Sequence, residues 1–312
     1  MAGINEERDG LTLSHQFTSK MHRQLYPAID PKNPSLSAAG KNVLITGATR
    51  GIGKSIALAW AEAGAAGIVV TGRQEKLLEE VADDLRRVSP KTKVVPIRAE
   101  ATSEDEVHSL WAKVKVELGK IDILIANAGV FSEGNVYPVT GKMAPSQWWS
   151  DLDINIHGTY LQVYSFLQQY LSEGKEPTGT VIILSSGAAA FTFPGMSAYA
   201  ISKLVGIRIA EHLNLEHPNV RSFAIHPGIV PTDMAPDMFA VQAVDPPEMA
   251  SGLSLYLATS RAEYLRGSYV AVNWDIEEME KHADEIREKK LLSTSFLNAK
   301  LGPEGHPFAD TT

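Results

Sequence analysis

A tyrosine and a lysine four residues apart are the first side chains in this sequence that are suited to proton chemistry. Tyr199 and Lys203 enclose the run Tyr-Ala-Ile-Ser-Lys inside a helical pattern, and residues i and i+4 share one helix face. A free tyrosine has a pKa of about 10 and is a poor acid or base near neutrality. A neighbouring lysine cation favours the phenolate and lowers that pKa. We expect the pair to give a proton to a carbonyl oxygen or to take one from an alcohol.

Such a pair is also common on solvated helix surfaces, so its surroundings decide its meaning. Ser186 stands thirteen residues before Tyr199, at the end of the apolar run Ile183-Leu184-Ser185. A serine at the carboxyl end of a buried strand opens onto the crevice in which α/β proteins bind ligands. Its hydroxyl can hold the oxygen on which Tyr199 acts.

A glycine cluster follows the first apolar run of the chain and precedes a helical pattern. It reads Thr46-Gly47-Ala48-Thr49-Arg50-Gly51-Ile52-Gly53, and its G-x-x-x-G-x-G spacing differs from the G-x-G-x-x-G of other dinucleotide folds. Glycines let the chain turn sharply and let backbone N–H groups approach a pyrophosphate at the helix N-terminus. Between a first strand and a first helix, the cluster predicts a dinucleotide site. The residues expected to form it are Gly47, Thr49, Arg50, Gly51, Ile52 and Gly53.

The end of the second strand bears on the choice of nicotinamide cofactor. An NAD site usually places a carboxylate there to accept from the ribose hydroxyls. Here the strand ends Val-Val-Thr-Gly-Arg at Arg73, without a carboxylate. Arg73 and Arg50 can instead hold a 2′-phosphate, although both could be ordinary solvated arginines. We therefore expect NADP(H), with NAD(H) as the less favoured alternative.

The elements that must position these residues follow from the alternation of apolar runs with helical patterns. Seven compact runs are expected to be strands: Val43–Thr46, Gly67–Thr71, Val94–Ile97, Ile121–Asn127, Val181–Ser185, Val220–His226 and Ser268–Asn273. Expected helices are Gly53–Ala63, Lys76–Val88, Glu104–Leu118, Gln147–Leu171, Ser197–Asn214 and Pro247–Ala258. This order predicts an α/β fold with a doubly wound, Rossmann-type parallel sheet of seven strands.

One domain is expected over residues 41–275, with an extension at each end. Residues 1–40 carry few periodic apolar positions, and Pro27, Pro31 and Pro34 break any helix there. Residues 276–312 are expected to be a C-terminal helix and tail. The exposed helix should cover Asp275–Lys290, and Gly302, Pro303, Gly305 and Pro307 should make the tail irregular.

Taken together, these motifs resemble the short-chain dehydrogenase/reductase family over roughly residues 40–275. The family is known for a glycine loop of this spacing, an Asn-Ala-Gly after the fourth strand, and a Ser/Tyr/Lys set spaced as here. Asn127-Ala128-Gly129 matches the second element, and Asp153–Gly158 looks like the helix segment of the family's fourth catalytic residue. The resemblance implies that Asn155 joins Ser186, Tyr199 and Lys203 and supports a water-mediated proton relay through Lys203.

The resemblance also implies cofactor contacts beyond the glycine loop. His226-Pro227-Gly228, with Val230 and Thr232 after it, is similar to the family's segment that contacts the nicotinamide carboxamide. The full set expected at the cofactor adds Arg73, Glu100, Ala101, Asn127, Ala128, Gly129, Tyr199, Lys203, Pro227, Gly228, Val230 and Thr232. The segments Tyr26–Pro31 and Asn273–Asp275 look like those of a subgroup of fungal members.

Two departures from the family pattern are visible. Glu100-Ala101 follows the third strand, where members often have an aspartate and an apolar residue near the adenine. The longer glutamate leaves the adenine contact to the backbone. The seventh strand runs on through Asn273–Asp275, where many members end in a glycine pair, and this puts the usual four-subunit packing in doubt.

Three segments are expected around the nicotinamide, and their apolar side chains predict a pocket for a medium-sized hydrophobic molecule. The candidates are Phe131, Tyr137, Trp148 and Trp149 after the fourth strand, Phe191, Phe193 and Pro194 after the fifth, and Met234, Met238 and Phe239 in a lid over residues 231–241. Each aromatic side chain could equally pack the core or a subunit interface.

Composition excludes several other classes of function. The 312 residues carry a formal net charge of −8 with no basic patch and no cysteine, so nucleic acid, an anionic membrane, a disulfide framework and a thiolate zinc site are not expected. No histidine or carboxylate spacing predicts a metal site. Neither a signal peptide nor an apolar run of about 18 residues is visible, and we expect a cytoplasmic protein.

The sequence therefore predicts a reversible NADP(H)-dependent oxidoreductase acting on a carbonyl or a secondary alcohol. Imine or olefin reduction, or an epimerisation, in the same pocket is the alternative within the enzyme class. A cofactor-binding regulator without catalysis is the alternative outside it, although such a protein would be expected to lose Tyr199 or Lys203. The resemblance further implies a homodimer or homotetramer that pairs through the helices at 147–171 and 197–214.

Overall fold

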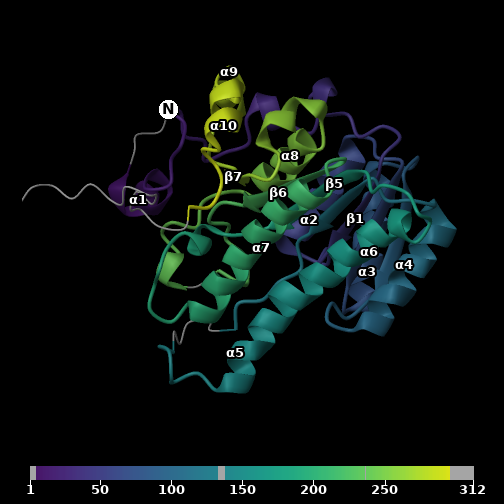
Figure 1. The fold of residues 1–312 in the computed structure, drawn as a ribbon, viewed down its shortest axis with the longest axis horizontal. Helices are drawn as coiled ribbons and strands as arrows, with labels where there is room; N and C mark the ends of the chain where they lie inside the picture. The colour runs from purple at the N-terminus through teal and green to yellow at the C-terminus, as the bar shows by residue number, and fades with distance from the viewer. Residues whose placement is uncertain (1–4, 133–137, 236, 296–312) are drawn as a thin grey trace, which may run out of the picture.

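The computed structural model describes residues 5–132, 138–235 and 237–295, and its centre is one parallel sheet (Figure 1). The strands are β1 (Asn42–Thr46), β2 (Gly67–Gly72), β3 (Lys93–Arg98), β4 (Ile123–Ala126), β5 (Gly179–Leu184), β6 (Val220–His226) and β7 (Tyr269–Ala271). Their order in space is β3-β2-β1-β4-β5-β6-β7, and every neighbouring pair is parallel. The predicted doubly wound α/β sheet of seven strands is confirmed. The chain order reverses between β1 and β4, and open α/β sheets bind ligands outside the carboxyl ends of strands at such a point.

Helices cover both faces of the sheet, and each strand contributes apolar side chains to both sides. Helices α2 (Gly51–Glu62), α3 (Glu75–Val88) and α8 (Glu248–Leu257) share one buried cluster, and α4 (Glu104–Leu118), α6 (Gly158–Leu171) and α7 (Ser197–Glu216) share the other. In β1, Val43 and Ile45 enter the first cluster, whereas Leu44 enters the second. Burial on two faces explains why the strands read as continuous apolar runs.

The helix predicted over Gln147–Leu171 differs from the observed one by an interruption. Helix α5 (Pro145–Leu152) passes into one π-helical turn, Asp153–His157, before α6 begins at Gly158. The Gly158 N–H donates to the carbonyl of Asp153, five residues earlier. Apolar periodicity predicts a helical stretch but not a π turn, which is a local change of hydrogen bonding often found at functional sites.

The N-terminal extension contains a helix that the sequence did not predict, α1 (Glu6–Leu13). It precedes the prolines, and the Asn5 side chain caps it by accepting from the Arg8 N–H. Its buried residues, Asp9 and Thr12, are polar, so α1 has no apolar stripe to reveal it. After α1 the chain continues as a strap through residues 14–36 along the molecule.

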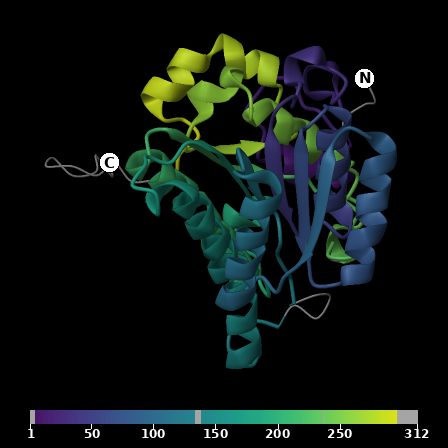
Figure 2. The same ribbon diagram turned by 90° about the vertical axis from the view of Figure 1, so that its right-hand side faces the viewer.

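The C-terminal region also differs from the expectation of one exposed helix. Two short helices occur, α9 (Ile276–Lys281) and α10 (Ala283–Lys289), and the side chains of Ile276, Met279 and Ile286 are buried. The N-terminal strap and these two helices lie at the same end of the molecule (Figures 1 and 2). The expected irregular tail at residues 302–307 lies outside the described residues.

Candidate active site

The glycine cluster forms a tight turn between β1 and α2 in which side chains would not fit. Gly47 and Gly51 adopt φ angles of +63° and +54°, a region that favours glycine. A β-carbon on Gly53 would lie 2.4 Å from the Gly47 carbonyl oxygen. Asn127 holds the turn, because its Nδ2 donates to the carbonyls of Thr46 (2.8 Å) and Gly47 (3.1 Å). The turn therefore leaves the backbone of the loop open to a ligand above β1 and β4.

A long cavity runs over this turn and along the carboxyl ends of the strands. It is lined by nearly all of the residues predicted for the cofactor: Gly47, Thr49, Arg50, Gly51, Ile52, Gly53, Arg73, Glu100, Ala101, Asn127, Ala128, Gly129, Tyr199, Lys203, Pro227, Val230 and Thr232. The exception, Gly228, lines the neighbouring pocket instead. Thr71 also lines the cavity, and its buried Oγ1 has no hydrogen-bond partner within the described chain. A buried hydroxyl without a partner is costly, so this cavity fits a ligand with polar groups, such as a dinucleotide.

The charged residues that line the cavity near the glycine turn and the end of β2 have different partners. Arg50 forms an ion pair with Asp233, and both side chains are mostly exposed. Asp233 also lines the cavity and was not predicted. Glu100 Oε1 accepts a hydrogen bond from the Ala101 N–H at 3.0 Å. Arg73 lines the same cavity at the end of β2, where it is placed to meet an anionic group.

Ser186, Tyr199 and Lys203 come together where the long cavity meets a second pocket. The side chain of Ser186 is hydrogen-bonded to Tyr199, and its Oγ accepts from the Ala188 N–H at 3.1 Å. Lys203 lies one turn below Tyr199 on α7, with its Nζ 5.6 Å from the centre of the tyrosine ring. That Nζ donates to the Leu184 carbonyl at 2.9 Å, which fixes the lysine against the end of β5.

Burial controls the protonation of the tyrosine and the lysine. It raises the pKa of Tyr199, and the hydrogen bond with Ser186 only partly offsets this. It lowers the pKa of Lys203 to about 8. Desolvation of the buried phenolate is therefore the larger of the two effects on the pKa of Tyr199.

Asn155 lies in the π-helical turn, and its side chain is occupied by protein groups. Its Nδ2 donates to the Val130 carbonyl and to Ser202 Oγ, both at 2.9 Å, and its Oδ1 accepts from the Val130 N–H at 2.8 Å. A β-carbon at Gly129 would lie 3.1 Å from both Asn155 Oδ1 and Lys203 Nζ. Asn155 is therefore close to Lys203, as predicted, and joins the loop after β4 to α7.

The second pocket opens beside Ser186 and Tyr199 and is mostly apolar. Of the predicted lining residues, Phe131, Phe191, Phe193, Met234 and Phe239 line it, together with Met196, Ile229 and others. Pro194, Trp148, Trp149 and Met238 are not among its lining residues; Trp148 Nε1 donates to Ser197 Oγ at 3.0 Å, and Trp149 is 63% exposed. Tyr137 lies outside the described residues.

Three residues of the N-terminal extension also line this pocket, and sequence reasoning missed them. They are Leu11, Thr12 and His15. No local pattern links them to residues 186–239, because only the tertiary fold brings α1 to the pocket. The prediction that the pocket is built from segments after β4, β5 and β6 was therefore incomplete.

The histidines of the site make no metal cluster within the described ranges. There, no group of three or more His, Cys, Asp or Glu side chains could hold a metal ion. His226 is buried, and its Nδ1 accepts from the Gly187 N–H at 3.0 Å. His157 pairs with Asp153 at 3.0 Å.

Across the described residues, no helix is long and apolar enough to cross a membrane.

Comparison with known proteins agrees with this geometry. The family model of the short chain dehydrogenases matches residues 41–243 of the chain. The chain belongs to this family. Members bind a nicotinamide cofactor, NAD or NADP, and act on small substrates.

The similar curated proteins are fungal. The dehydrogenase is 32% identical over 281 residues to the short chain dehydrogenase tazN of Aspergillus terreus, which covers 87% of the chain; the chain spans only 60% of that relative. It is 31% identical over 299 residues to the short chain dehydrogenase pigC of Monascus ruber, with 91% of the chain and 94% of the relative covered. This agrees with the fungal subgroup suggested by the sequence.

Solved structures share the same architecture. A short-chain type dehydrogenase/reductase from Mycobacterium marinum superposes with a TM-score of 0.67 at 29% identity, over 76% of this chain and 96% of that one. A 7α-hydroxysteroid dehydrogenase complexed with NADH and 7-oxo glycochenodeoxycholic acid gives a TM-score of 0.67 at 25% identity, over 77% and 95%. The dehydrogenase is thus an oxidoreductase with a Rossmann-like fold.

Proposed function

We propose that this dehydrogenase is an NADP(H)-dependent reductase of ketones that also oxidises the corresponding secondary alcohols, and that its substrate is a medium-sized hydrophobic molecule. The observation that carries the proposal is the position of Tyr199. Its side chain lines both the cofactor cavity and the aromatic pocket, and Ser186 is hydrogen-bonded to it. A carbonyl bound in the pocket would meet both hydroxyl groups next to the cofactor.

The proposed chemistry divides into a hydride and a proton. NADPH, when bound, supplies the hydride to the carbonyl carbon. Ser186 holds the carbonyl oxygen by a hydrogen bond, and Tyr199 gives its phenolic proton to that oxygen as it gains negative charge. The products are the alcohol and NADP⁺, and a solvent proton restores the phenol. In the reverse direction Tyr199 takes the alcohol proton.

Lys203 and Asn155 are proposed to keep the tyrosine supplied with protons. Because the pKa of Lys203 is about 8, its side chain can both release and regain a proton near neutral pH. Asn155 lies beside it and fixes the loop after β4. Together with Ser186 and Tyr199, these two residues make up the four-residue catalytic set that the family pattern implies.

The choice of NADP(H) rests on the charge at the end of β2. Arg73 lines the cavity there, and Gly72 and Gln74 beside it carry no negative charge. An arginine is suited to a 2′-phosphate, whereas a carboxylate would be suited to ribose hydroxyls. Arg50 is a second candidate for binding the 2′-phosphate. Its ion pair with Asp233 is exposed, and such pairs are weak enough for the phosphate to replace Asp233.

A homo-oligomer is part of the proposal and has its own observation. Helices α6 and α7 expose a set of large apolar side chains, namely Tyr160, Tyr164, Leu171, Ile201 and Leu204. Exposed apolar patches of this kind mark interaction surfaces. These are the helices through which the family resemblance implies that subunits pair.

Oxidation of NADPH by a panel of hydrophobic ketones tests the function. The proposal predicts turnover with NADPH and several ketones, and formation of NADPH from the matching alcohols and NADP⁺. Turnover of imines or activated olefins with every ketone inert would move the reaction to the alternative within the class. Binding of NADPH without turnover of any of these groups would contradict an oxidoreductase and favour a cofactor-binding regulator.

A further inference from the structure

Two histidines lie over Gly187, at the wall of the aromatic pocket next to Ser186. His226 ends β6, and His15 follows α1 in the N-terminal extension; both line the pocket. Their ring centres are 6.4 Å apart. A β-carbon at residue 187 would lie 3.2 Å from His226 Nε2 and 3.6 Å from His15 Cε1. The glycine thus leaves a space that both imidazoles border.

The protonation of His226 is fixed by its surroundings. Burial lowers its pKa to about 3, so the ring is neutral at physiological pH and carries one proton. The Gly187 N–H donates to Nδ1, which must therefore be the bare nitrogen. The proton is on Nε2. His226 consequently presents a hydrogen-bond donor on the side that faces Gly187.

His15 has the opposite arrangement. Burial lowers the pKa of His15, and a hydrogen bond with the Leu11 backbone offsets this only in part. The ring is therefore neutral near pH 7. Its Nε2 is buried and has no hydrogen-bond partner within the described residues, so Nδ1 faces the Leu11 carbonyl and carries the proton. Nε2 is a bare acceptor, and an unsatisfied buried acceptor in a pocket wall is a candidate for ligand recognition.

A chain of aromatic rings continues the wall from His15. The ring centres of His15 and Phe191 are 3.9 Å apart, those of Phe191 and Phe193 are 5.7 Å apart, and those of Phe193 and Phe239 are 6.1 Å apart. Phe131 packs edge-on against Tyr199 at 4.9 Å. Such walls favour a flat unsaturated ring system, because aromatic rings pair edge to face or offset with one another.

We propose that His15 and His226, the histidine pair, bind a hydroxyl group of the substrate, and that the substrate is an aromatic ketone bearing this hydroxyl near the carbonyl to be reduced. A hydroxyl is both a donor and an acceptor. It would donate to His15 Nε2 and accept from His226 Nε2–H, while the carbonyl reaches Ser186 and Tyr199 and the ring lies against the phenylalanines. This specificity site rests on the proposed function, since it orients the carbonyl for that reaction.

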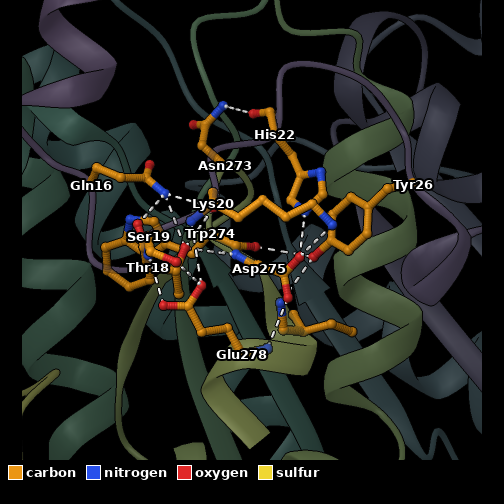
Figure 3. Close-up of polar contacts among 11 residues, drawn as sticks. Gln16, Thr18, Ser19, Lys20, His22, Tyr26, Asn273, Trp274, Asp275 and Glu278 are labelled. Carbon is orange, nitrogen blue, oxygen red and sulfur yellow. Dashed lines mark hydrogen bonds and ion pairs between the residues drawn. The ribbon is translucent and has the colours of Figure 1, made fainter. Parts of the chain in front are cut away.

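The N-terminal strap is built to hold His15 in place. The Trp274 indole N–H donates to the His15 carbonyl at 2.8 Å. The residues that follow are tied down as well (Figure 3): Glu278 accepts from Ser19, and His22 Nε2 lies 2.7 Å from Asp275 Oδ2. A pocket residue supplied by an extension therefore has a fixed position, which recognition of a single hydroxyl requires.

The test compares 1-tetralone with its four ring-hydroxylated derivatives, the 5-, 6-, 7- and 8-hydroxy-1-tetralones, in calorimetric binding and in NADPH-dependent turnover. The wild-type protein should bind one hydroxylated isomer about tenfold or more tighter than 1-tetralone, the range expected when a buried polar group gains its partner. His15→Leu should remove this preference, so that the ratio of the two Kd values falls to about one whatever happens to the binding of 1-tetralone itself. The exposed His212→Leu on α7 is the matched control and should retain the preference.

Two conservative variants separate recognition from a loss of structure. His15→Gln can keep an acceptor near the position of Nε2 and should restore part of the preference. His226→Asn can keep an acceptor for the Gly187 N–H but removes the Nε2–H donor, so it should lose the preference while its thermal unfolding remains cooperative. Equal losses for 1-tetralone and the hydroxylated isomer in His15→Leu would show a structural role and overturn the proposal.

Binding and turnover give distinguishable failures. If the wild-type protein binds no hydroxytetralone more tightly than 1-tetralone, the histidine pair is not a hydroxyl site, whether or not ketones are reduced. If a hydroxylated isomer binds preferentially and the preference depends on His15, but no ketone is reduced, the recognition site stands and the proposed reductase function fails.

Discussion

Asn155 Nδ2 donates a hydrogen bond to Ser202 Oγ at 2.9 Å, which joins the π-helical turn to α7 between Tyr199 and Lys203. Ser202 is buried, and its Oγ also donates to the Tyr199 carbonyl at 2.7 Å. Asn155 in addition holds Val130 through both of its backbone groups. The side chain of Asn155 therefore fixes the relative position of the loop after β4 and the helix that carries the proposed acid.

Replacing Asn155 with alanine should lower both stability and turnover. Three hydrogen bonds are lost, and the half-buried Val130 and the buried Ser202 lose partners, so we expect the free energy of unfolding to fall by about 1–3 kcal/mol. Urea denaturation measures this change. Ser202→Ala removes one of these three bonds and the bond from Ser202 Oγ to the Tyr199 carbonyl, but it leaves both bonds to Val130 in place and should have a smaller effect. Equal stability of Asn155→Ala and the wild-type protein would contradict the positioning role.

The buried Lys203 should make stability rise at alkaline pH. The pKa of Lys203 is about 8 in the folded protein, against an ordinary 10.5. Below pH 8 the lysine is therefore charged in both the folded and the unfolded protein, and the folded protein bears the cost of burying that charge. Between pH 8 and pH 10.5 the folded state releases its proton while the unfolded state keeps it, and the free energy of unfolding increases by about 3 kcal/mol. The difference between wild type and Lys203→Met across this interval isolates the lysine. The control Lys91→Met, at an exposed position, should show the same rise of the free energy of unfolding between pH 8 and pH 10.5 as the wild type. If Lys203→Met showed that rise as well, the prediction would be wrong.

Arg73 should set the preference for NADP(H) over NAD(H). Arg73→Ala is expected to raise the Kd for NADPH about tenfold or more, since a charge-assisted bond to the 2′-phosphate is lost, and to leave the Kd for NADH almost unchanged. Quenching of tryptophan fluorescence by each cofactor gives both constants. Arg86→Ala on α3, another partly exposed arginine, serves as the control. If wild type already binds NADH more tightly than NADPH, the cofactor assignment is wrong.

The N-terminal strap should depend on the carboxylate of Asp275. Burial alone would raise the pKa of Asp275, but the hydrogen bonds from His22, the Glu278 N–H and Lys20 hold it at about 2, below its ordinary 3.8. The resulting stability of about 2 kcal/mol is present above pH 3.8 and is lost as the pH falls through 2. Asp275→Asn should therefore destabilise the protein at pH 7 and have little effect near pH 2. Thermal unfolding at pH 7 and at pH 2 measures both effects. The control Asp284→Asn, at an exposed position, should leave stability unchanged at both pH values. If Asp275→Asn lost the same stability at both pH values, the charge of Asp275 would not be responsible.

The sequence predicted the sheet because local patterns determine it. Strands buried on both faces read as apolar runs, and the glycines at 47, 51 and 53 are required by the turn itself. Ser186, Tyr199 and Lys203 were brought together because strand ends and helix faces of a doubly wound sheet have fixed places. In these regions, local sequence and global fold agree.

The sequence did not predict features that depend on distant contacts. The π-helical turn at Asp153–His157 changes hydrogen bonding but not apolar periodicity. Helix α1 buries Asp9 and Thr12 rather than an apolar stripe, and His15 reaches the pocket only through the docked strap. The raised pKa of Tyr199 arises from burial, which a spacing of four residues cannot reveal.

The most direct measurement of the central claim is NADPH oxidation by Tyr199→Phe, compared with the wild type on the same ketone. The variant lacks only the phenolic hydroxyl group. We predict that its kcat falls by about 10²-fold or more, the usual contribution of a positioned acid, while its Kd for NADPH stays within about twofold of the wild-type value, because a single hydroxyl is removed from a long cavity. A Tyr199→Phe variant that keeps most of the wild-type turnover with intact cofactor binding would contradict the account.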